Sequence, residues 1–258
     1  MRAAPPTTRY VEHVMGMPIS LALRGRHTDD AAARVAWAAA LAELREADQV
    51  FSTYREDSCV SRLRRGEIGL EDCPAEVAEV LALGEAAERE SAGAFSVWLP
   101  GPDGRPVLDP SGVVKGWATE RAAEHLRALP DTDSCLSAGG DMTCTTADPA
   151  GRPWRIGIED PADPSRVLAV VPVLSGAVAT SGTAHRGAHL VDARTGRAPD
   201  GVASVTVVAE RLTWADIDAT AAYAAGAEAA HWLETRPGRS GLVVWADGTT
   251  TVVQPVLP

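Results

Sequence analysis

Four stretches of the chain combine good helix-forming residues with apolar positions at helical spacing, and each predicts a helix. Thr28 or Asp29 can cap the first helix, while Pro74 stands near the start of the second and Gly93 follows its end. A short helical turn is expected from Ser58. The predicted helices cover residues 28–51, 74–93, 113–129 and 213–236.

Runs rich in apolar and β-branched residues predict strands over residues 11–23, 134–144, 154–160, 166–182 and 202–210. Residues 240–253 are expected to form a hairpin around Asp247 and Gly248, and residues 101–112 a loop. Early helices followed by runs of strands, without strict βαβ alternation, predict an α+β fold. Because no repeat or long linker interrupts the chain, we expect one domain over residues 1–258, or two closely packed subdomains.

The composition is ordinary for a soluble globular protein, with 45% hydrophobic residues. The net charge of −11 argues against bare nucleic acid or an anionic membrane as the main partner, so an anionic ligand would need a local cation or metal. No signal peptide, lipobox or long apolar segment is evident, which predicts a cytoplasmic protein without a membrane span unless a leader was removed. The four cysteines are widely spaced without a CxxC pair, which predicts reduced buried thiols rather than zinc or a disulfide framework.

The segment LDPSGVVKG, residues 108–116, enters a predicted helix. Asp109, Ser111, Gly112 and Lys115 surround the entry, and free N–H groups beside a lysine suit a phosphate. The spacing is not that of a P-loop, and the alternative is a capped helix with a solvated lysine.

The segment SAGGDMTC contains Gly139 and Gly140, followed by Asp141. Two glycines permit the backbone to approach a ligand closely. The alternative is a glycine bulge within a strand.

The segment WADIDATAAY places Asp216 and Thr220 at positions i and i+4, on one face of the predicted helix. A carboxylate, a hydroxyl and a nearby carbonyl suit Mg²⁺ or Ca²⁺ rather than zinc. Asp218 points elsewhere on a regular helix, and the alternative role for Asp216 is that of an N-cap.

The segment AHLVDARTG, residues 188–196, holds His189, Asp192 and Thr195. His189 can act as a general base near neutral pH, with Asp192 to orient it, although a polar turn explains the same residues. His185 stands just upstream as a second candidate. The four segments together offer what metal-assisted chemistry on a diphosphate bond requires.

The order of these segments resembles the ApbE family, the FAD:protein FMN transferases. The series runs from MG at Met15 through FSTY, GAF, LDxxGxxKG, AGGD, ATSG and HLVDxRTG to SVTVVA and ADxxAT, and it covers about residues 10 to 230. The resemblance implies a T-fold-related α+β architecture, with mixed sheets, flanking helices and a flavin site in a cleft between the halves.

The resemblance also implies an activity. Such an enzyme splits FAD, its substrate, and moves FMN onto a Ser or Thr hydroxyl of an acceptor protein with Mg²⁺ or Mn²⁺, releasing AMP. The acceptor carries a motif resembling Ser/Thr-Gly-Ala-Ser/Thr. Two other hypotheses account for the same residues. The chain is then a metal-dependent FAD pyrophosphatase or a flavin-binding protein without turnover.

The resemblance assigns roles residue by residue. Catalysis falls to His189 as base, with Asp192 and Lys115. The metal would be held by Gly112 through its carbonyl and by the side chains of Asp216 and Thr220, with Ala219 close by. The FAD pocket would comprise Met15, Tyr54, Gly93, Ala94, Phe95, Asp109, Lys115, Gly139, Gly140, Asp141, Val191, Thr195 and Gly196.

The sequence also departs from the family pattern. Asp218 adds a carboxylate near the expected metal, and five other positions differ, which are Met17, Ser96, Pro110, Ser111 and Ala193.

Overall fold

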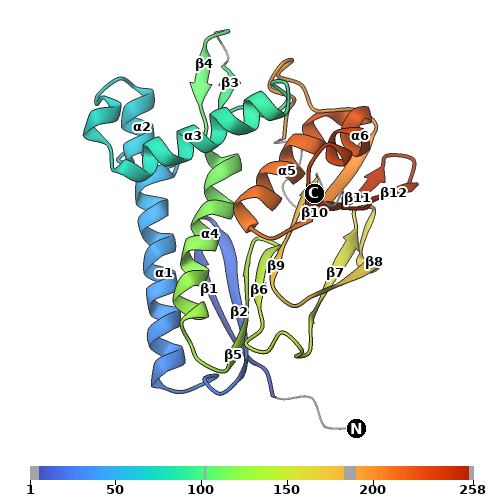
Figure 1. Cartoon of the computed structure of the whole chain (residues 1–258). Helices are drawn as coiled ribbons and strands as arrows, with labels where there is room; N and C mark the ends of the chain where they lie inside the picture. The colour runs from blue at the N-terminus through green and yellow to red at the C-terminus, as the bar shows by residue number, and fades with distance from the viewer. Residues whose placement is uncertain (1–5, 102, 183–189, 256–258) are drawn as a thin grey trace.

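One antiparallel sheet of eight strands organises the molecule (Figure 1). The computed structural model describes residues 6–101, 103–182 and 190–255. The strand order is β1-β2-β5-β6-β9-β10-β11-β12, and all neighbouring pairs are antiparallel. The strands are β1 (Thr8–Val14), β2 (Met17–Gly25), β5 (Thr132–Ala138), β6 (Asp141–Thr145), β9 (Gly176–Gly182), β10 (Val202–Ala209), β11 (Ser240–Trp245) and β12 (Thr250–Val253).

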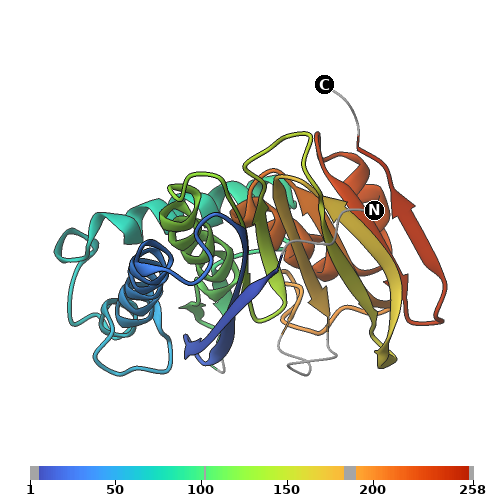
Figure 2. The same ribbon diagram turned by 90° about the horizontal axis from the view of Figure 1, so that it is seen from below.

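Three helices lie side by side on one face of this sheet, with α4 (Ser111–Arg127) between α1 (Ala31–Phe51) and α5 (Leu212–Ala224) (Figures 1 and 2). The smaller helical elements are α2 (Cys59–Arg64), η1 (Leu70–Asp72), α3 (Ala75–Glu90), η2 (Gly226–Glu228) and α6 (Ala229–Glu234). Two further hairpins complete the fold, β3 (Trp98–Pro100) with β4 (Pro106–Leu108), and β7 (Trp154–Asp160) with β8 (Asp163–Val173).

Alternating residues of the sheet belong to two separate cores. Leu136 of β5 is fully buried in the core beneath the helices, whereas its neighbour Cys135 packs on the other face with Cys144. Ile156 and Val173 of the β7–β8 hairpin cover that second face. Since successive side chains of a strand point to opposite faces, β5 is buried on both faces although polar residues alternate with apolar ones along it.

The α+β prediction is confirmed, and the first three predicted helices form within a few residues of their expected bounds. The first helix is capped by Asp30 rather than Thr28 or Asp29, because the Asp30 carboxylate accepts a hydrogen bond from the Ala33 amide at 2.9 Å. Ser58 caps α2 as expected. The predicted helix over 213–236 is broken after α5, where Gly226 takes a φ of +60° that a helix cannot continue.

Three predicted single strands prove to be two strands each. Residues 11–23 fold back at Met15 and Gly16, which both have positive φ, and residues 134–144 fold back at Gly139 and Gly140. Such two-residue turns match the twist of a hairpin, and apolar residues on both sides conceal them in the sequence. Residues 166–182 divide between β8 and β9, and the expected loop over 101–112 contains β4.

Helices α4 and α5 approach closely because glycine stands at their contact. A Cβ atom on Gly116 would lie 2.8 Å from the Leu212 carbonyl oxygen and 2.9 Å from the Asp216 Cβ. Within the described residues, no helix is both long and apolar enough to cross a lipid bilayer.

Glu120 of α4 holds the start of α5. Its Oε2 accepts hydrogen bonds from the Thr213 amide at 2.9 Å and from the Thr213 hydroxyl at 2.6 Å, and its Oε1 pairs with Arg211. Helix α5 has no side-chain cap of its own, so a carboxylate from the neighbouring helix fills that role. Although burial opposes the charge, these bonds hold the pKa of Glu120 below its ordinary value.

We expect Glu120→Gln to lower the free energy of unfolding by about 1–3 kcal/mol near neutral pH, because charged hydrogen bonds are lost. A carboxyl whose pKa is lowered by folding stabilises the folded state at pH values above its unfolded pKa. That contribution is lost as the pH falls through the folded pKa. The difference between wild type and variant should therefore shrink below about pH 4. Urea denaturation at several pH values measures this difference in the free energy of unfolding.

Glu124→Gln is the matched control, since Glu124 lies one turn further along α4 and forms only an exposed ion pair with Arg127. It should change stability by less than about 1 kcal/mol. Equal losses in the two variants, or a Glu120 effect independent of pH, would contradict the capping role.

Candidate active site

A buried lysine joins three elements at one end of the helical layer. Lys115 of α4 forms ion pairs with Asp141, the first residue of β6, and with Asp216 of α5, whose Oδ1 lies 3.0 Å from the Lys115 Nζ. Each carboxylate side chain is only 2% exposed. The Gly116 amide donates to Asp216 at 2.9 Å, and the Thr180 amide donates to Asp141 at 2.8 Å.

The charges of this group do not balance, because two carboxylates face one ammonium. Burial raises the pKa of Asp216 to about 7, and the attraction of Lys115 only partly opposes that shift. Burial acts to lower the pKa of Lys115, but the two carboxylates outweigh it and hold the pKa above its ordinary value. The lysine is therefore charged, and the site carries excess negative charge when both carboxylates ionise.

Thr220 and Gly112 lie next to this group. A Cβ on Gly112 would lie 4.0 Å from the Thr220 methyl carbon and 3.0 Å from the ring of Phe95. The Thr220 hydroxyl is 3.1 Å from the Ser181 hydroxyl. Asp216 and Thr220 thus share one face of α5, as their spacing predicts, and Asp216 is not an N-cap.

Ala219 lies in the apolar core between α5 and the sheet, with no exposed side chain. Among the described residues, no three or more His, Cys, Asp and Glu form a cluster suited to a metal. Any metal here would depend on hydroxyl and carbonyl oxygens besides the Asp216 carboxylate.

Two hairpin turns lie at the same edge of the sheet. Met15 and Gly16 join β1 to β2, while Gly139 and Gly140 join β5 to β6. The Gly139 amide donates to the Pro18 carbonyl at 3.1 Å, which brings the turns together. The glycine pair is a hairpin turn rather than a bulge, and it places Asp141 at the first buried position of β6.

The segment after residue 189 packs against the turn that follows α3. The Ala193 amide donates to the Ala94 carbonyl at 3.1 Å, and a Cβ on Gly93 would meet the Arg194 side chain at 3.4 Å. Gly196 similarly lies against Pro100. The segments Gly93–Phe95 and Val191–Gly196 are therefore in contact. The family resemblance assigned both segments to the FAD pocket but gave no contact between them.

Asp192 is engaged by its own loop. Its carboxylate accepts hydrogen bonds from the Arg194 amide and guanidinium, each at 2.9 Å, and these hold its pKa below the ordinary value. Thr195 and Gly196 donate their amides to the Asp192 carbonyl and close the turn. His189 and His185 lie outside the described residues, so the predicted pairing of His189 with Asp192 stays a prediction.

Tyr54 lies at the surface, and Asp109 lies at the start of α4. The Tyr54 side chain is 97% exposed and borders a hollow of about 240 Å³ that is also lined by Arg55, Arg64 and Arg65, and this hollow is separate from the Lys115 group. Asp109 accepts a hydrogen bond from the Ser111 amide at 3.1 Å, so it supports the start of α4.

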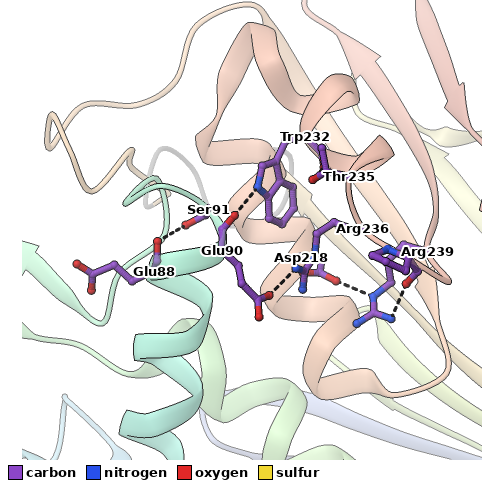
Figure 3. A network of polar contacts seen from close by, with 9 residues as sticks. Glu88, Glu90, Ser91, Asp218, Trp232, Thr235, Arg236 and Arg239 are labelled. Atoms are coloured by element: carbon purple, nitrogen blue, oxygen red, sulfur yellow. Dashed lines mark hydrogen bonds and ion pairs between the residues drawn. The ribbon is translucent and has the colours of Figure 1, made fainter. Parts of the chain in front are cut away.

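Asp218 is not near the expected metal ligands, which corrects that expectation. It is 1% exposed and pairs with Arg236 at 3.0 Å and with Arg239 at 2.7 Å, on another face of α5 (Figure 3). Burial raises its pKa despite the two arginines. The Arg236 guanidinium also pairs with Glu90 and lies over the rings of Trp214 and Trp232, so this network fastens α5 to α3 and α6.

Sequence reasoning missed the ion pairs of Lys115, because a solvated lysine is the ordinary outcome at a helix start.

Ser96, which departs from the family pattern, donates its hydroxyl to the Glu88 carboxylate at 2.8 Å and accepts a hydrogen bond from the Trp98 amide. Two residues of β9 also contact the site. The Thr180 amide donates to Asp141, and the Ser181 hydroxyl lies next to that of Thr220. In the sequence, only the ATSG motif pointed to these two residues.

The α+β fold brings a lysine, two carboxylates and a threonine close together. The chain that forms this site matches a known protein family. The family model of ApbE matches residues 15–100 and 102–243. The chain belongs to the ApbE family.

Curated relatives agree with this assignment, and two solved structures share the fold. A protein of Rhodobacter capsulatus named FAD:protein FMN transferase is 36% identical over 47% of this chain and 24% of its own length. A protein of the same name from Salmonella typhimurium is 28% identical over 55% of this chain and 43% of its own length, so the matches span less than half of these relatives. The apo flavinyl transferase ApbE of Pseudomonas stutzeri superposes with a TM-score of 0.82 at 24% identity over 97% of this chain and 95% of its own. The ApbE protein of Thermotoga maritima superposes with a TM-score of 0.76 at 21% identity, over 96% of this chain and 97% of its own.

We expect Lys115→Met to lower the free energy of unfolding by about 3–5 kcal/mol, because it leaves two buried carboxylates without their cation. Chemical denaturation measures this loss. Arg194→Met is the control, since the Arg194 side chain is 47% exposed and Asp192 keeps its hydrogen bond from the amide of residue 194, and it should cost less than about 1 kcal/mol. A Lys115 variant as stable as wild type would show that the ion pairs contribute little.

Proposed function

We propose that this chain transfers FMN from FAD to a Ser or Thr hydroxyl of an acceptor protein and releases AMP. The observation that carries the proposal is the convergence of Gly112, Lys115, Asp216 and Thr220, the residues to which the family resemblance assigns metal and phosphate binding. The names of the curated relatives support the same reaction. We treat the chain as a single catalytic domain.

A divalent cation, Mg²⁺ or Mn²⁺, fits the donors present. Asp216, the Thr220 hydroxyl and the Gly112 carbonyl are hard oxygen ligands, and the excess negative charge of the Lys115 group favours a cation there. When bound, the metal would neutralise charge on the FAD diphosphate. So few protein ligands imply that substrate oxygens complete the coordination.

Lys115 is proposed to bind a phosphate oxygen. Its side chain is 18% exposed, and two carboxylates hold its ammonium in place. These carboxylates fix the direction of the lysine and keep it charged, which is what anion binding requires.

His189 is the proposed base. It accepts the proton of the acceptor hydroxyl while that oxygen attacks the phosphorus of the FMN half. The bond from this phosphorus to the oxygen of the AMP half breaks, and AMP leaves with that oxygen. Asp192 and the turn it closes with Arg194 support the segment that follows His189.

The FAD pocket is proposed to lie along the edge that carries both hairpin turns. Met15 is partly exposed there and packs on the core that contains the buried Phe95, and the glycine turns allow close backbone approach. The proposed lining is Met15, Tyr54, Gly93, Ala94, Phe95, Asp109, Lys115, Gly139, Gly140, Asp141, Val191, Thr195 and Gly196.

The test incubates the protein with FAD, Mg²⁺ and an acceptor carrying a Ser/Thr-Gly-Ala-Ser/Thr-like motif. We expect flavin fluorescence on the denatured acceptor band together with AMP release, and loss of both after chelation by EDTA. AMP and free FMN without a labelled band would indicate an FAD pyrophosphatase. Binding of FAD without consumption would indicate a carrier, and either result would refute transfer.

His189→Ala should bind FAD as wild type does but transfer FMN slower by on the order of 10²–10⁴, because the hydroxyl loses its base. Single-turnover labelling of the acceptor measures the rate. His185→Ala is the matched control and should transfer at the wild-type rate. Equal rates for wild type and His189→Ala would remove His189 from the mechanism.

Asp216→Ala should shift the Mg²⁺ dependence of transfer to at least about tenfold higher concentration, because the only carboxylate among the proposed ligands is lost. Asp218→Asn is the control two positions away, since Asp218 faces two arginines instead. It should lower stability and leave the Mg²⁺ midpoint unchanged. An identical Mg²⁺ titration for wild type and Asp216→Ala would argue against this metal site.

A further inference from the structure

We propose that Cys59 and Cys73 form a reversible redox site, which a small-molecule disulfide such as oxidised glutathione converts to an intramolecular disulfide. The two Sγ atoms lie 2.6 Å apart, and both cysteines are free thiols. A disulfide bond is about 2.05 Å long, so only a small movement separates the thiols from the bonded state. Residues widely spaced along the sequence are therefore neighbours in the fold.

The local structure holds both cysteines in place. Cys59 is the first residue of α2, directly after the cap Ser58, whose hydroxyl donates to the Ser52 carbonyl at 2.6 Å. Cys73 closes η1, with its amide donating to the Leu70 carbonyl at 3.1 Å, and Pro74 follows at the start of α3. The backbone on each side is thus fixed by hydrogen bonds rather than by the thiols.

Exposure distinguishes this pair from the other two cysteines. Cys59 and Cys73 are half-buried, so a reagent in solution can reach them. Cys135 and Cys144 also face each other, across β5 and β6, but both are buried and their Sγ atoms lie 3.5 Å apart. The expectation of buried thiols therefore holds for the second pair only.

The reaction proceeds by two exchanges. The Cys59 thiolate attacks one sulfur of glutathione disulfide, forms a mixed disulfide and releases one glutathione thiolate. Cys73 then loses its proton to solvent and attacks the Cys59 sulfur, which releases the second glutathione. The two protein thiols are oxidised and one glutathione disulfide is reduced to two thiols. Burial and the adjacent Cys59 sulfur raise the pKa of the Cys73 thiol, which disfavours its thiolate, so the proposed order begins at Cys59.

The bond would connect the start of α2 to the start of α3. Tyr54 precedes Cys59 in the loop between α1 and α2, and Gly93 follows α3. Oxidation would therefore fasten α2, which follows the Tyr54 loop, to the start of α3, whereas Gly93 lies beyond the other end of that helix. The proposal itself does not depend on flavin transfer, since counting thiols tests it without any substrate.

The test equilibrates the folded full chain with mixtures of reduced and oxidised glutathione, quenches with acid and counts thiols by alkylation and intact mass. We expect wild type to lose two of its four thiols and the mass of two hydrogen atoms, reversed by reduction. Peptide mapping should place the link between Cys59 and Cys73. The oxidised protein should also unfold at higher denaturant concentration than the reduced protein.

Variants separate the two steps. Cys73→Ser should stop at one glutathione bound to Cys59, while Cys59→Ser should react more slowly and form no internal link. Cys135→Ala is the matched control and should still form the Cys59–Cys73 bond. Circular dichroism checks that each variant is folded. Four free thiols in wild type under excess oxidised glutathione, a link mapped to other cysteines, or a Cys73→Ser protein without adduct would overturn the proposal.

Discussion

The Lys115 ammonium, held between Asp141 and Asp216, is the contact on which the candidate site depends. It joins the central helix, the sheet and the last long helix, and these elements are far apart in the sequence. Removing two carboxylates and a lysine from water is costly, and only close pairing with further hydrogen bonds offsets that cost. The amides of Gly116 and Thr180 supply those bonds, so helix, strand and ion pairs form as one unit.

Helix α5 is fixed on two faces by opposite arrangements of charge. On one face, two carboxylates enclose a single lysine. On another, Asp218 is enclosed by Arg236 and Arg239 (Figure 3). The guanidinium of Arg236 also lies over the rings of Trp214 and Trp232. Because both networks are largely buried, neither face of the helix can rotate without breaking ion pairs in low dielectric. The proposed metal ligands Asp216 and Thr220 therefore lie on a rigid helix rather than on a loop.

Much of this arrangement could be predicted, and the reasons for the failures are physical. Helical spacing identified α1 and α4, and the i, i+4 rule correctly put Asp216 and Thr220 together and Asp218 elsewhere. The hairpin at Met15 was missed because apolar residues continue through its turn. The partners of Lys115 and the meeting of Cys59 with Cys73 depend on the tertiary fold, which local patterns do not encode. Only the order of the motifs connected the distant segments.

The turn at Gly139 and Gly140 carries a constraint on how this chain can vary in length. Asp141 follows the turn directly, at a buried position of β6. Inserting one residue there would shift the register by one and send every β6 side chain to the opposite face of the sheet. Asp141 would then point toward the β7–β8 side and leave Lys115 with one partner. Insertions and deletions in related chains should accordingly avoid this turn and accumulate where β7 meets β8, because the connection between Asp160 and Asp163 contains none of the Lys115 group's residues.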